Sequence, residues 1–464
     1  MEFTSLPFLL FFPTVALLCW VMPVRWRNAF LLLVSMAFYT MWKPSCLAFL
    51  LWIMVVSYGA GYVFEKPQHR SKVKLGLSIA VLLSALTFFK FLSPISRVVG
   101  AFIQSSGYAI RFDGLNWAIP VGLSTYTLQA IGYVVDVYRD RVPREHSWLN
   151  HALFLSFFPT VLSGPINRSF DLMPQIKERR FGFNAQLASQ GARMLVWGYF
   201  LKLAVADRFD MYTLSVFDHV SEYNGFTLAF AMVCYLFQMY CDFAGYSFIA
   251  IGMGRLLGVK LKDNFNRPFF AMGAGEFWHR WHMALSGWLR DYVYIPLGGS
   301  RCSHARATLN TLFTFFISGI WHGGSFRFIA WGLCNGLLVA VSRFLPLKQW
   351  KAIVPIRIMF TLLTLLLLSF VWVFFQPNYA EILHQLTCNF MPLSIKLPHS
   401  LQARATLVYM ALTFIIVMTR DGYEEFLNKK STPRALSLTC YAMVVWLILM
   451  IGVFDSSQFI YVMF

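Results

Sequence analysis

The sequence predicts an all-α, polytopic membrane protein that forms a single membrane domain over residues 1–464. Hydrophobic residues make up 58% of the chain and charged residues only 13%, which is about half the ~25% charged share of an average soluble domain. The mean hydropathy is +0.58. This composition excludes a disordered chain, a coiled coil and an ordinary soluble enzyme, because lipid must be the solvent for most of the surface.

Apolar stretches recur along the whole chain, and each one predicts a helix. A helix needs about 17–25 mostly apolar residues to cross roughly 30 Å of hydrocarbon. We divide the domain into N-terminal spans (1–145), a core with re-entrant elements (146–345) and C-terminal spans (346–464). About 11–12 transmembrane helices are expected, near residues 6–22, 28–42, 46–64, 73–92, 117–137, 187–206, 225–257, 307–321, 328–345, 353–375, 405–419 and 435–454.

Three stretches depart from the pattern of a simple span. Residues 225–257 are too long for one straight crossing and contain Asp242 and Gly245, so we expect two pieces or a break. Residues 150–163 are short and bounded by proline, which suits a re-entrant or interfacial element. Residues 120–140 carry polar side chains along a predicted span, and should therefore line the interior of the bundle or a cavity.

The positive charge of the chain is explained by the membrane rather than by nucleic acid. There are 39 Lys and Arg against 21 Asp and Glu, which gives a net charge of +18. No compact basic stripe with interleaved aromatic residues is present, so we expect no nucleic-acid partner. The loops after the first, third and fifth predicted spans are the basic ones, which predicts cytoplasmic loops on anionic lipids and an N-terminus outside.

The densest polar region is EFWHRWHMALSGWLRDYVYIPLGGSR, residues 276–301. On a continuous helix, Trp278 and His282 fall roughly on one face together with two leucines, and Glu276 pairs with Arg280 at i,i+4. The tryptophans give apolar bodies with polar edges, which is typical of a helix in or near the membrane interface. The alternative is an amphipathic packing helix with an aromatic belt, and His282 is the residue that we favour as functional.

A second candidate is His322, in the segment GIWHGGSFRFIAWG. It closes the apolar stretch 309–321, and an ionisable residue at membrane depth is costly and therefore a functional hypothesis. Histidine suits acyl transfer because its ordinary pKa lies near neutrality. Gly323 and Gly324 would allow a substrate chain to approach the backbone closely. The alternative is a helix-end histidine that is hydrogen-bonded to a carbonyl.

A metal site is an alternative role for the same histidines. His279, His282 and His322 could together form a three-histidine site. Neither an HExxH nor a CxxC motif accompanies them. We therefore expect no metal.

A third candidate lies in YCDFAGYSFIAIGMGRLLG, where Asp242 interrupts an apolar run with Gln238 one turn before it. A buried carboxylate needs a partner, and Arg255, Arg280 and Arg290 are the candidates. We assign Asp242, Gln238 and Arg290 to a substrate-binding group. The alternative is an ion pair that fixes the register of a helix.

Together these motifs resemble the membrane-bound O-acyltransferase family, and most of all its bacterial branch of the alginate O-acetyltransferase type. The resemblance covers almost the whole chain, and its specificity rests on the order and joint presence of the motifs. They are PVGLSTYTLQAIGYVVDVYRD, GYFLKLAVADR (198–208), YCDFAGYS, NFNRPFF (264–270), EFWHRWHMALSGWLRDYVYIPLGGSR, GIWHG and FVWVFF (370–375).

The resemblance implies a ring of helical spans around a thin, funnel-like centre, with His322 near that centre and His282 as the second family histidine. It implies a multi-pass protein of the bacterial inner membrane. The donor is cytoplasmic, with acetyl-CoA expected as a substrate rather than a bound cofactor. The acceptor is an extracytoplasmic polysaccharide, either alginate-like or peptidoglycan, and an SGNH-type acetyltransferase outside the membrane is the expected partner. The chain departs from the family at His279, where Arg is common, and at Phe248, where Asp is common.

The resulting hypothesis is O-acetyl transfer across the membrane. His322 acts as general base, and His282 orients the thioester or stabilises negative charge on its oxygen. Trp278, Trp281 and Trp321 shape a narrow apolar passage for the donor arm. Cationic side chains in the loops hold the donor's phosphates; we expect Lys260, Lys262 and Arg301.

Two alternatives come from other classes of protein. One is a transporter or flippase of an acyl compound, against which the lack of internal repeats counts. The other is a non-catalytic scaffold that recruits the SGNH acetyltransferase.

Overall fold

The computed structural model describes residues 2–42, 44–106, 120–162, 164–397, 401–427 and 434–454. Over these ranges the regular structure is helical throughout, without a strand. The α-helices are α1 (Leu6–Val21), α2 (Val24–Thr40), α3 (Leu47–Phe64), α4 (Lys72–Thr87), α5 (Ser93–Ser105), α6 (Leu123–Tyr138), α7 (Trp148–Ser156), α8 (Phe158–Val161), α9 (Ser169–Lys177), α10 (Ala185–Tyr199), α11 (Asp207–Phe217), α12 (Gly225–Leu256), α13 (Ala274–Arg280), α14 (Met283–Leu289), α15 (His304–His322), α16 (Phe326–Ser342), α17 (Leu347–Trp350), α18 (Val354–Val371), α19 (Tyr379–Cys388), α20 (Leu401–Phe426) and α21 (Arg434–Ile451).

Short 3₁₀ and π segments join or extend these helices. The 3₁₀ segments are η1 (Pro44–Cys46), η2 (Pro67–His69), η5 (Val220–Glu222), η6 (Pro268–Phe270) and η8 (Trp372–Phe375). The π segments are η3 (Phe88–Leu92), η4 (Phe200–Ala206) and η7 (Arg290–Tyr294). A π segment inside an α-helix is uncommon and is often found at functional sites.

The all-α, polytopic membrane architecture is confirmed. Each predicted apolar stretch falls on a helix, although residues 117–119 of the fifth stretch lie outside the described residues. Within the described ranges, five helical segments are long and apolar enough to cross a membrane: Pro44–Phe64, Lys72–Phe91, Gly225–Leu256, Val354–Phe375 and Arg404–Phe426. Three shorter apolar helices accompany them: Leu6–Val21, Phe326–Ser342 and Leu438–Ile451.

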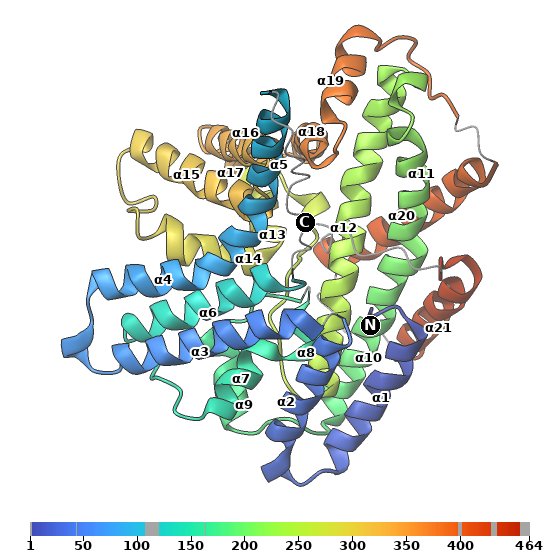
Figure 1. Ribbon diagram of the computed structural model, residues 1–464. Helices are drawn as coiled ribbons and strands as arrows, with labels where there is room; N and C mark the ends of the chain where they lie inside the picture. The colour runs from blue at the N-terminus through green and yellow to red at the C-terminus, as the bar shows by residue number, and fades with distance from the viewer. Residues whose placement is uncertain are drawn as a thin grey trace.

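The long helix α12 runs through the middle of the molecule and packs against α10 and α11 (Figure 1). It is one uninterrupted helix of 32 residues, about 48 Å at 1.5 Å per residue, so the expected break near Gly245 is wrong. Gly245 does not kink the helix, because its role is close packing: a Cβ there would lie 2.9 Å from the carbonyl oxygen of Gly198 on α10. Asp242 does not interrupt the helix because it is ion-paired.

Helix α6 lies inside the protein, as the polar residues of 120–140 predicted. Almost all of it is buried. Its Asp136 carboxylate accepts hydrogen bonds of 2.8 Å from the hydroxyl of Ser169 and from the hydroxyl of Tyr292. The short element expected near 150–163 is present as α7 and α8, which are largely buried short helices.

The predicted continuous helix from Glu276 onward is wrong, because the chain breaks at Trp281 and His282. Trp281 is extended, and His282 has a φ of 44°, which is left-handed and rare outside glycine. The local pair survives, with 2.7 Å between Arg280 and Glu276. Trp278 and Trp281 are buried, so this segment is packed inside the protein rather than laid on its surface.

Helices α15 and α16 form a tight hairpin that fixes the end of α15. Only three residues connect them. A Cβ on Gly319 would lie 2.3 Å from the carbonyl oxygen of Phe328 on α16, a distance that no side chain tolerates, so glycine is required at this crossing. The close approach holds the last turn of α15 against α16.

Candidate active site

His322 is the last residue of α15, and its side chain is buried inside the protein with 4% of the residue exposed. Aromatic rings surround the imidazole. The centroid distances are 4.7 Å to Trp321, 4.7 Å to Trp331 on α16 and 5.3 Å to Phe375 in η8. Three separate elements therefore hold the ring in place, and it does not face lipid.

A buried lysine lies on the other side of Trp321. Lys90 comes from the π segment η3, donates a hydrogen bond to the carbonyl oxygen of Trp321, and has its Nζ 5.3 Å from the Trp321 ring centroid. Sequence reasoning missed this residue. The signal was present, because Lys90 sits inside the predicted span 73–92 and an ionisable residue within a span is a functional hypothesis.

The two glycines after His322 serve protein packing. A Cβ on Gly323 would lie 2.4 Å from the ring of Phe328, and a Cβ on Gly324 would lie 2.7 Å from the carbonyl oxygen of Lys90. The space where a Cβ would project is thus filled by the chain itself, so packing alone requires glycine at both positions.

His282 lies against the same tryptophan, with 6.2 Å between its ring and that of Trp321. Its Nδ1 is 3.0 Å from Oδ1 of Asn264, and that oxygen also accepts the backbone N–H of Ala284 at 3.2 Å. A backbone N–H can only donate, so the atom that faces it is the amide oxygen. His282 must therefore donate from Nδ1, which leaves Nε2 with the lone pair.

Asn264 is itself fixed, because its amide nitrogen donates to the hydroxyl of Ser247 at 2.9 Å. It lies in the NFNRPFF motif and is 1% exposed. Sequence reasoning did not single it out, since its partner His282 is 18 residues away in the chain.

Buried tryptophans form a connected group around His322. The ring of Trp278 is 5.6 Å from that of Trp331, which is 5.8 Å from that of Trp372. The indole N–H groups of Trp278, Trp321, Trp331 and Trp372 are buried and have no hydrogen-bond partner within the described ranges. Trp321 and Trp331 contact His322 directly, and Trp278 and Trp372 contact Trp331. A buried donor without an acceptor costs roughly 1–3 kcal/mol, so this group of donors favours a polar group that binds there.

Trp281, which the sequence predicted to line the donor passage, contacts the tryptophan group through other rings. Its ring stacks on Phe277 at 5.2 Å and contacts Trp372 at 5.1 Å. It packs against the tryptophan group through Trp372.

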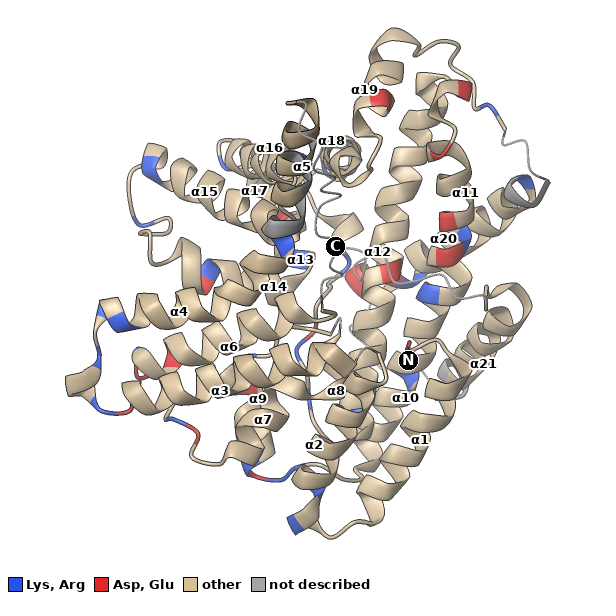
Figure 2. Ribbon diagram, in the orientation of Figure 1, with Lys and Arg blue, Asp and Glu red and all other residues tan. Residues whose placement is uncertain are grey.

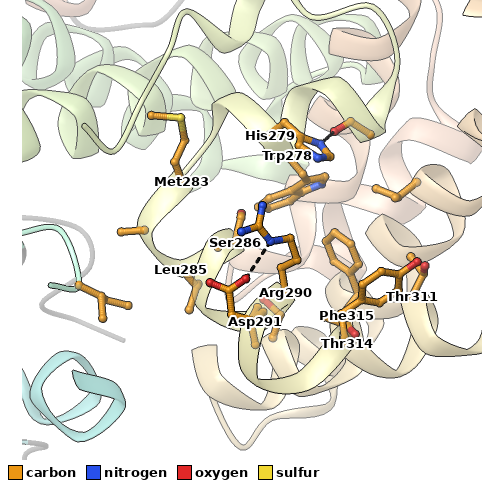
Figure 3. Close-up of a pocket in the computed structure, with 18 of the residues that line it drawn as sticks. Trp278, His279, Met283, Leu285, Ser286, Arg290, Asp291, Thr311, Thr314 and Phe315 are labelled. Atoms are coloured by element: carbon orange, nitrogen blue, oxygen red, sulfur yellow. Dashed lines mark hydrogen bonds and ion pairs between the residues drawn. The ribbon is translucent and has the colours of Figure 1, made fainter. Parts of the chain in front are cut away.

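A cavity of about 590 Å³ opens between α13, α14 and α15 and leads toward this group (Figure 3). Its wall on α15 is formed by Thr311, Thr314, Phe315 and Ser318, on one face of the helix. The innermost of these residues, Ser318, is one turn before His322, about 6 Å along the axis. Trp278 also lines the cavity, so the rings of Trp278 and Trp331 separate the cavity from His322.

Cationic side chains gather at this cavity. It is lined by four of them and by two acidic residues; these are Arg168, Lys262, Arg290 and Arg343, with Asp263 and Asp291. The predicted Arg290 bonds Asp291 at 2.9 Å, as Figure 3 shows. Of the three predicted phosphate contacts, Lys262 lines the cavity, whereas Lys260 and Arg301 do not.

Asp242 and Gln238 belong to a separate polar network. Lys202 of η4 lies 2.8 Å from Asp242 and 2.8 Å from Asp207, and all three residues are at most 4% exposed. The expected arginine partners of Asp242 are therefore wrong: Arg255, Arg280 and Arg290 bond Gln190, Glu276 and Asp291 instead. A lysine in the predicted span 187–206 was the signal that sequence reasoning overlooked.

Gln238 extends this network to α11. It donates to Asp210 at 2.7 Å and accepts from Thr213 at 2.6 Å. The structure thus brings Gln238 and Asp242 to the packing of α12 with η4 and α11, and neither lines the cavity beside Trp278.

His279 lines the cavity, and its Nδ1 is 2.6 Å from the carbonyl oxygen of Gly275, to which it donates. Across the part of the chain that the structure describes, no three His, Cys, Asp or Glu side chains lie close enough to hold a metal ion.

Comparisons with known proteins show the family to which the chain belongs. Residues 34–352 match the model of the membrane-bound O-acyltransferase family. The chain is 32% identical to the probable alginate O-acetylase AlgI of Pseudomonas putida, over 94% of this chain and 90% of the relative, and 32% identical to that of Pseudomonas aeruginosa, over 82% and 73%. It is 30% identical to the peptidoglycan O-acetyltransferase of Helicobacter pylori, over 76% and 71%. The chain belongs to the membrane-bound O-acyltransferase family and is an O-acyltransferase.

Proposed function

We propose that the protein transfers acetyl groups from a cytoplasmic thioester, acetyl-CoA, across the bacterial inner membrane for the O-acetylation of a polysaccharide outside it. One observation carries the proposal: a cavity with a basic lining reaches Ser318, one helical turn before His322, and this buried histidine contacts the indole rings of Trp321 and Trp331. The named relatives favour an alginate-like exopolysaccharide or peptidoglycan as the acceptor.

The distribution of charge supports a cytoplasmic donor. Trp20 at the end of α1 donates to the carbonyl oxygen of Leu256 at the end of α12, which places these two ends on one side of the protein. Lys262 at the cavity follows soon after Leu256. Figure 2 shows Lys and Arg at the junctions of α1 with α2 and of α3 with α4. On the positive-inside rule, we propose that the cavity opens to the cytoplasm and that the N-terminus lies outside.

The donor's chemistry matches the cavity. The phosphates of a nucleotide thioester fit the guanidinium groups of Arg168, Arg290 and Arg343, which present planar forks of donors. The hydroxyls along α15 suit the amide groups of a pantetheine arm. The acetyl group then meets the tryptophan group beside His322.

The reaction needs one general base, and it needs hydrogen-bond donors for the thioester carbonyl oxygen. In our proposal His322 takes the proton of the acceptor hydroxyl as its oxygen attacks the thioester carbonyl, and returns it to the leaving thiolate, so that an ester and a thiol are formed. A positioned base contributes roughly 10²–10⁴-fold. We further propose that the indole N–H of Trp331, whose ring contacts His322 and which has no partner within the described residues, donates to the carbonyl oxygen as its charge grows. His282, with its lone pair on Nε2, orients the substrates.

The direct test uses the purified protein in liposomes with a donor that carries one label on acetyl and another on CoA. We expect His322→Ala to lose at least 10²-fold in the rate of acetyl transfer while its melting temperature and membrane insertion stay at those of the wild type. A His322→Ala variant that transfers acetyl at the wild-type rate would remove His322 from the mechanism.

The two labels also separate the alternative classes. A transporter keeps acetyl and CoA together, whereas a transferase separates them. A scaffold for the SGNH acetyltransferase that we propose as partner would leave His322→Ala fully active in the presence of that partner. Loss of acetylation in the variant together with intact partner binding therefore favours the enzyme.

A further inference from the structure

A second cavity, of about 330 Å³, lies where the loop before α10 meets the loop after α12. Four cationic residues line it: Arg27, Arg179, Arg180 and Lys260. None of the described residues in its lining is acidic. It is separate from the 590 Å³ cavity beside Trp278, which we call the donor cavity after the proposed function. Lys260 of the second cavity is only two residues from Lys262 of the donor cavity.

Hydrogen bonds to backbone carbonyl oxygens fix the residues that line the cavity. Arg27 donates to the carbonyl oxygens of Met22 at 3.0 Å, Phe181 at 2.5 Å and Trp20 at 3.3 Å. These bonds fix its guanidinium and use three of its five N–H groups. The backbone N–H of Gly182 donates to the carbonyl oxygen of Leu257 at 2.7 Å and ties the two loops together.

The side chain of Gln175 fixes the backbone of Lys260 through two hydrogen bonds. The Gln175 side chain accepts the backbone N–H of Lys260 and donates to its carbonyl oxygen, both at 2.9 Å. The cationic side chain of Lys260 is thereby carried on a rigid stretch of chain at the rim of the cavity.

The positive charge of the cavity is largely uncompensated. Arg180 pairs with Glu178 at 2.5 Å. Arg179 and Lys260 form no ion pair with any described residue. The N-terminus of α10 also faces this cavity through Asn184 and Leu187, and a helix N-terminus favours an anion.

Aromatic rings border the cavity. Phe183 lines it and is 61% exposed. Its ring contacts that of Trp20 on the apolar helix α1, at 4.9 Å between centroids. Cationic groups beside exposed aromatic rings are typical of the membrane–water interface.

We propose that this cavity binds the phosphate headgroup of an anionic phospholipid on the same side of the membrane as the mouth of the donor cavity. Arg179, Lys260 and the remaining N–H groups of Arg27 contact the phosphate, and the acyl chains lie along Phe183 and α1. The shape and charge fit a phosphate, and the exposed rings favour a lipid over a free ion.

The test measures lipid binding by the full-length protein in a neutral detergent, from its melting temperature in titrations with phosphatidylglycerol and with phosphatidylcholine. We expect phosphatidylglycerol to stabilise the protein and phosphatidylcholine not to. The Arg179→Ala/Lys260→Ala variant should bind phosphatidylglycerol roughly 30-fold more weakly, which corresponds to about 1 kcal/mol for each of the two cations removed.

The matched control is Lys66→Ala/Lys74→Ala, which removes the same charge from two exposed lysines at the junction of α3 with α4, outside the cavity. It should bind phosphatidylglycerol as the wild type does. An equal loss in the control, or equal stabilisation by phosphatidylcholine, would overturn the proposal.

Two further arms address the other sources of phosphate. Glycerol 3-phosphate that stabilises as strongly as the lipid would make the site one for a soluble phosphate. Displacement of phosphatidylglycerol by coenzyme A would make it part of the donor site. Melting without lipid shows whether each variant is folded.

Discussion

The buried triad of Lys202, Asp207 and Asp242 gives the sharpest prediction for stability. Lys202 is the shared cation of two carboxylates, each 2.8 Å away, and all three residues are at most 4% exposed. Replacing Lys202 with Met keeps the length and most of the volume of the side chain but removes the charge. Two buried carboxylates then lose their shared cation in the middle of the protein.

The expected cost follows from that geometry. Breaking a buried ion pair by removing one partner costs about 3–5 kcal/mol, and here one cation serves two anions, so we expect the upper part of that range. The variant Lys202→Met/Asp207→Asn/Asp242→Asn removes all three charges together. It should recover most of the loss, because replacing a buried ionic group as a whole is often close to neutral.

The assay is reversible unfolding by SDS in mixed micelles, which reports the free energy of unfolding. Lys262→Met is the matched control, since its ion pair with Asp171 is also 2.8 Å long but has 57% and 31% of the side chains exposed. Exposed pairs contribute at most about 1 kcal/mol. The reasoning is refuted if Lys202→Met costs no more than the control, or if the triple variant is as unstable as the single one.

Two predictions concern the active site. Trp331→Phe keeps a ring against His322 but removes an indole donor, and should lower kcat by about 10²-fold if that donor binds the charged oxygen; an unchanged kcat would leave the indole a packing role only. Asn264→Leu removes the acceptor of both His282 and Ala284, and should lower kcat by about 10²-fold through misplacement of the imidazole, with Asn264→Asp retaining more activity. Equal activity of the two Asn264 variants would contradict that role.

Residue spacing in the sequence correctly predicted those features that depend on residues close together in the chain. The pair of Glu276 and Arg280 forms as expected because i,i+4 residues meet on any helical turn. The end of the helix at His322 could be placed because glycines follow it directly. The interior position of α6 followed from polar residues on an apolar span.

Sequence-based prediction failed for contacts between segments that are far apart in the chain. Lys202 and Asp242 are 40 positions apart, and nothing in their spacing shows that η4 packs on α12. The break at His282 depends on Asn264, whose side chain binds both His282 and Ala284 across it. Local helical periodicity favoured a continuous helix there, and these tertiary hydrogen bonds overrode it.

The amino-acid sequence by itself determined that this is a helical membrane protein, because hydropathy is a property of the chain, and it singled out His322 and His282 as the candidates for its chemistry by residue type and position. Only the tertiary structure decided that Lys202 neutralises Asp242, that Asn264 sets the protonated nitrogen of His282, and that a basic cavity ends beside Trp278. Hydrogen bonds and ion pairs act over about 3 Å in space, whatever the distance along the chain.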